Sequence, residues 1–162
     1  MDKRAAGILM PITSLPSEYG IGCFSKSAYD FVDWLKEAGQ SYWQILPLGP
    51  TSYGDSPYQS FSTFAGNPYF IDLETLTGEG LLTAQECEYG CERIREDKID
   101  YEKIYKIRFQ ILEKAFSRFG ENDEYRAFVS ENQFWLEDYS LYMAIKDRNG
   151  GYPAFSKGDN KM

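Results

Sequence analysis

The sequence contains no histidine, only three cysteines and no long hydrophobic run. Without histidine, these 162 residues cannot form a Ser–His or Cys–His catalytic pair. No stretch approaches the roughly 18 consecutive apolar residues of a membrane-spanning helix. The apolar run near the N-terminus, residues 7–10, is also shorter than the roughly 7–15 residues at the centre of a secretory leader. We therefore expect a cytoplasmic protein without a membrane partner.

The three cysteines form neither a disulfide framework nor a CxxC motif. Cys87 and Cys91 are four residues apart and could share one face of a helix, so half of a metal site is conceivable. The sequence offers no histidine and no second cysteine pair to complete such a site. Ordinary reduced thiols are the better interpretation, and we expect no metal site.

Basic residues are outnumbered, because 17 Lys and Arg stand against 25 Asp and Glu and the formal net charge is −8. This charge disfavours a nucleic-acid partner, whose phosphates attract a basic face, and equally an anionic membrane surface. Aromatic residues, by contrast, make up 17% of the chain, and tyrosine leads with 13 copies. Tyrosine has a flat apolar face and a polar tip, so tyrosines can fill a core or form platforms beneath sugar rings. Composition alone does not decide between these uses.

The first part of the chain has the pattern of a strand, a helix and a second strand. Residues 6–10 are a short apolar run typical of a strand buried on both faces. Ser25 is a suitable N-cap for a helix with apolar residues at helical spacing, which is expected to end at Gly39. Residues 42–46 form the second predicted strand. This order predicts a right-handed β-α-β unit with parallel strands.

The second half of the chain is predicted to be helical, after a short strand at residues 69–73. Thr83 and Glu86 form a capping box that should open a short helix reaching about Tyr89. Three longer helices are expected at residues 101–119, 123–132 and 137–148. The charged stretch around residue 100 is expected to be a solvated helix start.

Residues 47–69 have no usable period, but they contain four prolines, three glycines and several aromatic side chains. A long loop of this kind inside a compact domain is typically functional. It follows a predicted parallel strand, at whose carboxyl end sheets and barrels place their ligands. The YGDSPYQS stretch places Tyr53 and Tyr58 on either side of a stiff turn, with hydrogen-bonding groups on Asp55, Ser56 and Gln59. Such a surface suits a polyhydroxyl ligand, but these tyrosines could equally fill a gap beneath the loop.

Acid–base chemistry on a sugar would need two carboxylates about 5–9.5 Å apart. Asp55 is the only carboxylate within residues 47–69. Asp30, Asp33 and Glu37 fall on the polar side of the first predicted helix, and we expect them to be solvated. The stretch GDSPYQS is not a P-loop, and no GxGxxG follows the first strand. The residues therefore predict a sugar-binding surface without a catalytic carboxylate pair.

Three stretches carry a resemblance to the amylomaltase family (4-α-glucanotransferase, or disproportionating enzyme). They are RAAGILMPITSLPSEYGIG, YDFVDWLKEAGQSYWQILPLGPT and YGDSPYQSFSTFAGNPYFIDLE. A fourth stretch, WLEDYSLYMAIKDRNGGYPAFS, is similar to a helical segment of the family's insertion. The resemblance covers nearly all of the chain, and it points to the N-terminal portion of the family.

The resemblance implies an α/β fold, namely an incomplete (β/α)8 TIM barrel whose first β-α-β unit is followed by a mainly helical insertion. Residues 1–75 would form the N-terminal part of the barrel with the sugar-binding loop 47–69. Residues 76–162 would form a truncated helical insertion subdomain. Because a whole barrel takes about 250 residues, the missing C-terminal part of the same barrel is an expected partner.

The resemblance also implies the transfer of α-1,4-glucan segments between maltooligosaccharides by a retaining double displacement, without metal or organic cofactor. By the match to the loop motif, Tyr58 and Ser56 would contact the sugar near the cleavage point. Tyr53 would belong to an outlying glucan-binding position, and Asp55 would shape the turn. The family's catalytic carboxylates lie downstream of these motifs, so the chain alone is expected to be inactive. A glucan-binding module without chemistry and a non-functional truncated product are the alternatives.

Overall fold

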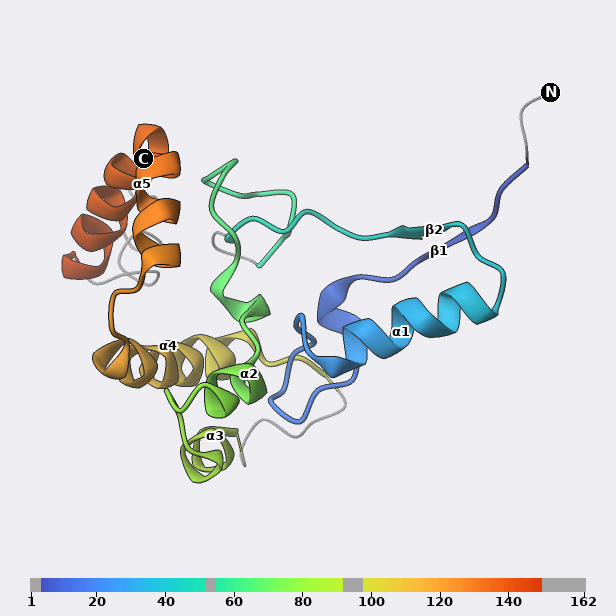
Figure 1. The fold of residues 1–162 in the computed structure, drawn as a ribbon, viewed down its shortest axis with the longest axis horizontal. Coiled ribbons are helices and arrows are strands. Elements are labelled where there is room, and N and C mark those ends of the chain that lie inside the picture. Colours follow the sequence, from blue (N-terminus) through green and yellow to red (C-terminus); the bar gives the residue numbers. More distant parts are fainter. Residues whose placement is uncertain (1–3, 52–54, 92–97, 150–162) are drawn as a thin grey trace, which may run out of the picture. The chain divides into compact units, whose positions relative to one another are not determined.

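The computed structural model describes residues 4–51, 55–91 and 98–149, with the side chains of residues 89–91 excepted. The elements in chain order are β1 (Gly7–Leu9), η1 (Ile12–Ser14), α1 (Lys26–Glu37), β2 (Tyr42–Gln44), η2 (Pro68–Phe70), α2 (Leu73–Gly78), α3 (Ala84–Cys91), α4 (Tyr101–Arg118) and α5 (Asp123–Arg148), as Figure 1 shows. Contacts within the chain group them into two compact units. The first unit comprises Met1–Leu48 and Asn67–Phe119, and the second comprises Gly49–Gly66 and Gly120–Met162. The boundary at residue 75 between barrel and insertion stays a prediction.

The predicted β-α-β unit is present in the first compact unit. β1 and β2 pair in parallel, with Gly7 opposite Tyr42. A Cβ at Gly7 would lie 2.6 Å from the carbonyl oxygen of Tyr42, so this close pairing requires glycine. α1 begins directly after Ser25, and Gly39 follows its end with a φ of +68°, a conformation that favours glycine. The predicted start and end of this helix are confirmed.

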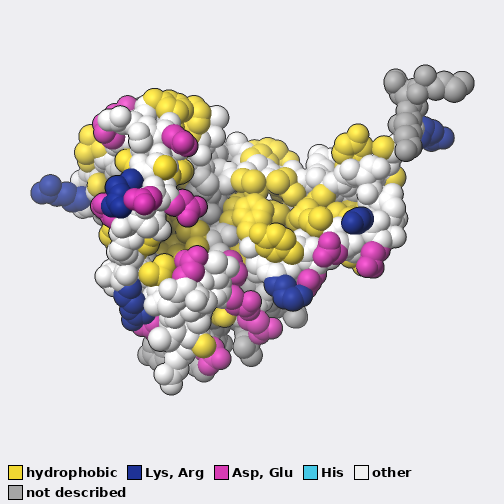
Figure 2. Space-filling model, in the orientation of Figure 1, with side chains coloured by type: hydrophobic (Ala, Val, Ile, Leu, Met, Phe, Trp, Pro, Cys, Tyr) yellow, Lys and Arg dark blue, Asp and Glu magenta, His cyan; other side chains and the backbone are white. Residues whose placement is uncertain are grey.

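The prediction that the first strand is buried on both faces is wrong for the described residues, and the second strand is exposed as well. Leu9 is 56% exposed and Tyr42 is 67% exposed, and only the central residue of each strand is partly covered. α1 contacts the sheet through Phe31, whose ring centroid lies 4.9 Å from that of Trp43. Among the described residues the sheet has two strands, so its outer edges have no strand neighbours. Figure 2 shows hydrophobic side chains at the surface over the strands.

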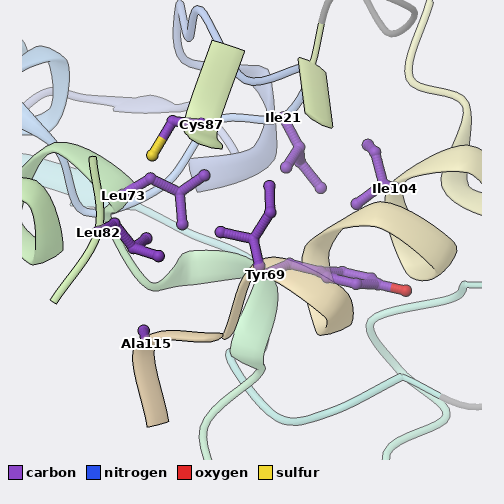
Figure 3. Close-up of a cluster of buried hydrophobic side chains, with 8 residues drawn as sticks. Ile21, Tyr69, Leu73, Leu82, Cys87, Ile104 and Ala115 are labelled. Carbon is purple, nitrogen blue, oxygen red and sulfur yellow. The ribbon is translucent and has the colours of Figure 1, made fainter. Parts of the chain in front are cut away.

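The main core of the first unit is built by α2, α3 and α4 and by segments that precede α2. Its buried members are Ile21, Tyr69, Leu73, Leu82, Cys87, Ile104, Ile111 and Ala115. In Figure 3 the labelled aliphatic members turn toward one another. An apolar stripe on α4 faces this core through Ile104, Ile111 and Ala115.

The predicted capping box of the third helix is confirmed. The backbone N–H of Thr83 donates to Glu86 Oε2 at 3.0 Å, and the N–H of Glu86 donates to Thr83 Oγ1 at 3.3 Å. The carboxylate of Glu86 also receives two bonds from Arg118 of α4, each 2.7 Å long. One side chain thus caps α3 and joins it to α4.

The strand predicted at residues 69–73 is wrong, because this segment forms η2 and the start of α2. Asn67 Oδ1 accepts a bond from the N–H of Tyr69 at 3.0 Å. Asp72 then caps α2 by accepting bonds from two N–H groups of its first turn, at 3.3 and 3.1 Å. These two side chains bond the backbone locally and so favour turns over an extended strand.

The two helices predicted at residues 123–132 and 137–148 are one continuous helix, α5. The predicted break is wrong because residues 133–136, Gln-Phe-Trp-Leu, contain neither glycine nor proline. Asn122 caps the helix by accepting a 2.8 Å bond from the N–H of Tyr125. No residue of α5 is buried. Within the described ranges, no helix is both long and apolar enough to span a membrane.

Candidate functional site

The loop singled out by its sequence is closed at its base. The N–H of Asn67 donates to the carbonyl of Leu48 at 2.9 Å, which brings the two ends of segment 49–66 together. Inside the segment, Thr51 and Ser60 form an isolated antiparallel bridge. The described part of the segment therefore forms a loop with two successive closures, which agrees with its proline and aromatic content.

The described tip of the loop, residues 55–59, forms a tight turn. Asp55 has a φ of 54°, in the left-handed region that few non-glycine residues adopt. Its Oδ1 accepts a bond from Thr51 Oγ1 at 3.5 Å. Burial raises the pKa of Asp55, and the bond from Thr51 opposes this rise. At the other end of the turn, the N–H of Gln59 donates to the carbonyl of Ser56 at 3.1 Å.

The four predicted site residues have different surroundings. Tyr58 is 73% exposed, so its ring fills no gap among the described residues. Ser56 and Asp55 are half-buried in the same turn. Tyr53 lies outside the described residues. The structure thus brings Asp55, Ser56 and Tyr58 together on one short turn.

The other aromatic residues of the loop contact α5 within the second unit. Phe61 stacks on Tyr139 with ring centroids 6.4 Å apart, and Phe64 stacks on Trp135 at 5.8 Å. Lys146 Nζ lies 4.3 Å from the centroid of the Phe61 ring, a favourable cation–π position. α5 therefore supports the side of the loop that does not carry the turn.

This supporting role of α5 was not predicted from the sequence. The available signal is the spacing of Trp135, Tyr139 and Tyr142, which places three aromatic rings on one helix face. Trp135 Nε1 donates to Asn132 Oδ1 at 2.9 Å, which fixes the orientation of the indole. Desolvation is the largest cause of the raised pKa of Tyr139 and of the lowered pKa of Lys146.

A cavity of about 240 Å³ lies in the first unit. It is bordered by the loop before α1, by the first turn of α1 and by Asp72. Its charged lining combines Lys26 with several carboxylates, and Lys26 is itself paired with Asp30 at 2.6 Å. Asp55, Ser56 and Tyr58 do not border this cavity.

Cys23 and Cys87 are free, buried thiols, as predicted. Cys23 Sγ donates to Asp72 Oδ1 at 3.8 Å, and burial followed by the Asp72 charge raises the pKa of this thiol. A protonated thiol is a poor nucleophile, so Cys23 is a structural residue. The side chain of Cys91 lies outside the described residues. In the described part of the chain, no group of three or more His, Cys, Asp or Glu residues could hold a metal ion.

The similarity of this chain to known proteins agrees with the resemblance seen in its motifs. A family model described as 4-alpha-glucanotransferase matches residues 10–159. The chain is 54% identical over 153 residues to the 4-alpha-glucanotransferase of Streptococcus pneumoniae serotype 4, which covers 91% of this chain and 30% of that protein. It is 51% identical over 139 residues to the 4-alpha-glucanotransferase of Clostridium butyricum, covering 85% of this chain and 28% of that protein.

The fold is similar to the solved structure of an amylomaltase from Streptococcus agalactiae in complex with acarbose. The TM-score is 0.79 at 42% sequence identity, and the match covers 91% of this chain and 30% of that chain. The chain thus spans about 30% of the length of these relatives. The family model covers all but the two ends of the sequence, and the chain belongs to the 4-alpha-glucanotransferase family.

Proposed function

We propose that this chain is the N-terminal portion of an enzyme that transfers α-1,4-glucan segments between maltooligosaccharides. We also propose that the loop of residues 47–69 supplies contacts to the glucan. Family membership supports the reaction class, and the acarbose complex of the Streptococcus agalactiae amylomaltase supports a sugar-like ligand. The observation that carries the proposal is Tyr58, which is exposed on a turn closed by the backbone bond from Gln59 to Ser56 and by the Thr51–Ser60 bridge.

The turn suits a glucose ring, which has apolar C–H faces and a rim of hydroxyl groups. The ring of Tyr58 supplies an apolar platform, and the hydroxyls of Tyr58 and Ser56 can donate or accept hydrogen bonds. Because the turn is already closed, little conformational freedom is lost when a glucan binds. Asp55 shapes this turn, and Tyr53 contributes to an outlying glucan position.

The chemistry itself is assigned to residues outside this chain. A retaining transfer needs a nucleophilic carboxylate and an acid–base carboxyl group about 5–5.5 Å apart. The loop offers one carboxylate, Asp55, which is engaged by Thr51 within the turn. This chain therefore binds and orients the glucan while other carboxylates break the bond, and the reaction needs neither metal nor organic cofactor.

We further propose that β1, α1 and β2 are the first β-α-β unit of a (β/α)8 barrel, with residues 1–75 as its N-terminal part and residues 76–162 as a helical insertion. The exposure of Leu9 and Tyr42 supports this arrangement. Every strand of a closed barrel is paired on both edges. The partner that would cover these strands is the remaining part of the same barrel.

Titration of the chain with maltoheptaose tests the binding proposal. We expect saturable binding that is weakened about tenfold or more in Tyr58→Ala, because the stacking platform is removed. Tyr29→Ala is the matched control, since Tyr29 on α1 is 71% exposed and Tyr58 is 73% exposed. Tyr58→Phe keeps the ring, so the difference between its affinity and that of the parent chain measures the contribution of the hydroxyl to binding. Equal affinities of the Tyr58→Ala and Tyr29→Ala variants would contradict the proposal.

A second experiment tests where the chemistry takes place. The purified 162-residue chain is incubated with maltotriose, and released glucose is measured. We expect none, because the loop holds a single carboxylate and a retaining transfer needs two. Glucose release that follows the chain through purification would show that this chain carries its own catalytic pair.

A further inference from the structure

We propose that Gly49 and Ser60 are positioning residues, and that their close contact sets the turn that presents Ser56 and Tyr58 to the glucan. The inference rests on the proposed function and adds to it two residues that touch no substrate. Both lie in segment 49–66, within the second compact unit.

Gly49 is required by close approach. A Cβ built at this position would lie 2.4 Å from Ser60 Oγ, 3.0 Å from Ser60 Cβ and 3.1 Å from the carbonyl oxygen of Ser62. The φ of Gly49 lies outside the left-handed region, so its backbone alone would accept another residue. An added Cβ would therefore force the side chain of Ser60 to move.

Ser60 is held in place by two side-chain bonds to Ser62 and by its backbone bridge to Thr51. Its Oγ donates to the carbonyl of Ser62 at 2.7 Å and accepts from the N–H of Ser62 at 3.3 Å. Its backbone pairs with Thr51. Ser62 Oγ in turn accepts from the N–H groups of Phe64 and Ala65, at 3.3 and 3.0 Å. A displaced Ser60 would therefore disturb the bridge and the segment that packs on α5.

Ser60 also reaches both ends of the turn. It directly follows Gln59, whose N–H donates to the carbonyl of Ser56 at 3.1 Å. Its bridge partner Thr51 donates a hydroxyl to Asp55 at the beginning of the turn, at 3.5 Å. The space beside Gly49 thus sets the position of Ser60, and Ser60 sets the orientation of the turn that carries the proposed sugar contacts.

The experiment compares two Gly→Ala variants of the same loop by titration with maltoheptaose. Gly49→Ala is expected to weaken binding about tenfold. Gly66→Ala is the matched control, because nothing lies within 4 Å of a Cβ at Gly66, and its affinity should stay within about twofold of the parent. The double variant Gly49→Ala/Ser60→Gly removes both crowded atoms of Ser60 but also its two bonds to Ser62, so it should recover only part of the lost affinity.

Amide hydrogen exchange of Gly49→Ala, measured without sugar, distinguishes a local change in the turn from a general loss of stability. Gly49→Ala should speed exchange of the Gln59 amide about tenfold, because its bond to Ser56 is loosened, while amides in α4 exchange as in the parent chain. Faster exchange throughout α4 would identify general destabilisation and overturn the inference.

The failures of the two proposals are distinguishable. If Gly49→Ala binds like Gly66→Ala, the positioning role is overturned even when Tyr58→Ala abolishes binding. If the parent chain and Tyr58→Ala bind alike, or neither binds, the proposed function fails and this inference fails with it.

Discussion

The two compact units are stabilised by different kinds of contact. The first unit encloses aliphatic side chains almost completely, and Leu73 and Ile104 are 0% and 1% exposed. The second unit contains α5, which has no buried residue and contacts the loop through the rings of Phe61 and Phe64. Full burial of aliphatic surface stabilises more strongly than ring contacts at half-exposed positions. We conclude that the first unit provides most of the stability.

This difference also bears on how the loop keeps its shape. Segment 49–66 has little buried apolar surface, and its turn is fixed by local hydrogen bonds and by the crowded position beside Gly49. Regions of low local stability are where proteins commonly place binding loops. The second unit should therefore lose its structure locally before the first unit unfolds.

The largest expected effect is the loss of a core side chain in the first unit. Leu73→Ala should lower the free energy of unfolding by about 3 kcal/mol, because it leaves a cavity where no solvent enters. Leu141→Ala on α5, where the side chain is 61% exposed, should change it by no more than about 0.5 kcal/mol. Urea denaturation followed by tryptophan fluorescence measures the free energy of unfolding of both variants. Equal losses would contradict the claim that the first unit provides most of the stability.

A smaller effect is expected from the ring contacts of the second unit. Phe64→Ala removes the stacking on Trp135 and the edge contact with Phe134, whose centroid is 5.2 Å away. We expect α5 to lose about 1 kcal/mol of local protection, measured by hydrogen exchange of its amides. Amides of α4 should keep their exchange rates, and an equal change in both helices would show that the two units unfold as one.

A further effect of limited size concerns the ion pair that joins α3 to α4. Arg118, with help from Thr83, lowers the pKa of Glu86 from its ordinary value of 4.5 to about 2. The pair therefore stabilises the folded chain fully above pH 4.5, and this contribution is lost as the pH falls toward 2. Thermal melts of the parent chain and of Glu86→Gln between pH 6 and pH 2 should converge at the acid end. A constant difference across this range would contradict the assignment.

The smallest effect is expected from the ionisation of Asp55, which should change the stability of the turn with pH. Because burial raises its pKa above 3.8, ionisation of Asp55 weakens the folded turn. The turn should be most stable below pH 3.8 and should lose part of that stability as the pH rises through the folded-state pKa. Carboxyl carbon NMR should give an Asp55 midpoint above 3.8, and a midpoint at or below this value would show that the Thr51 bond outweighs burial.

Much of the first unit could be predicted because local chemistry specifies it. The capping box of Thr83 and Glu86, the left-handed Gly39 and the stripe of α4 each depend on residues a few positions apart. The burial of β1 and β2 could not be predicted in this way, since it depends on neighbours distant in the sequence. The strand expected at residues 69–73 was wrong because the Asn67 and Asp72 side chains bond the backbone into turns.

The site was predictable only in part for the same reason. The composition of YGDSPYQS indicated the stiff turn, but it left open whether Tyr58 is exposed or fills a gap, and the structure shows it exposed. The support of Phe61 by Tyr139 and the contact of Gly49 with Ser60 join residues many positions apart. Apolar residues lie all around α5, so no clear amphipathic period marked it as one helix.

The most direct test of the central claim is NMR chemical-shift mapping of the chain during titration with maltoheptaose. The account predicts the largest amide shifts at Ser56, Tyr58 and Gln59, with saturation at one common affinity. Shifts confined to residues around the cavity of the first unit, such as Lys26 and Asp30, with the loop amides unchanged, would contradict it.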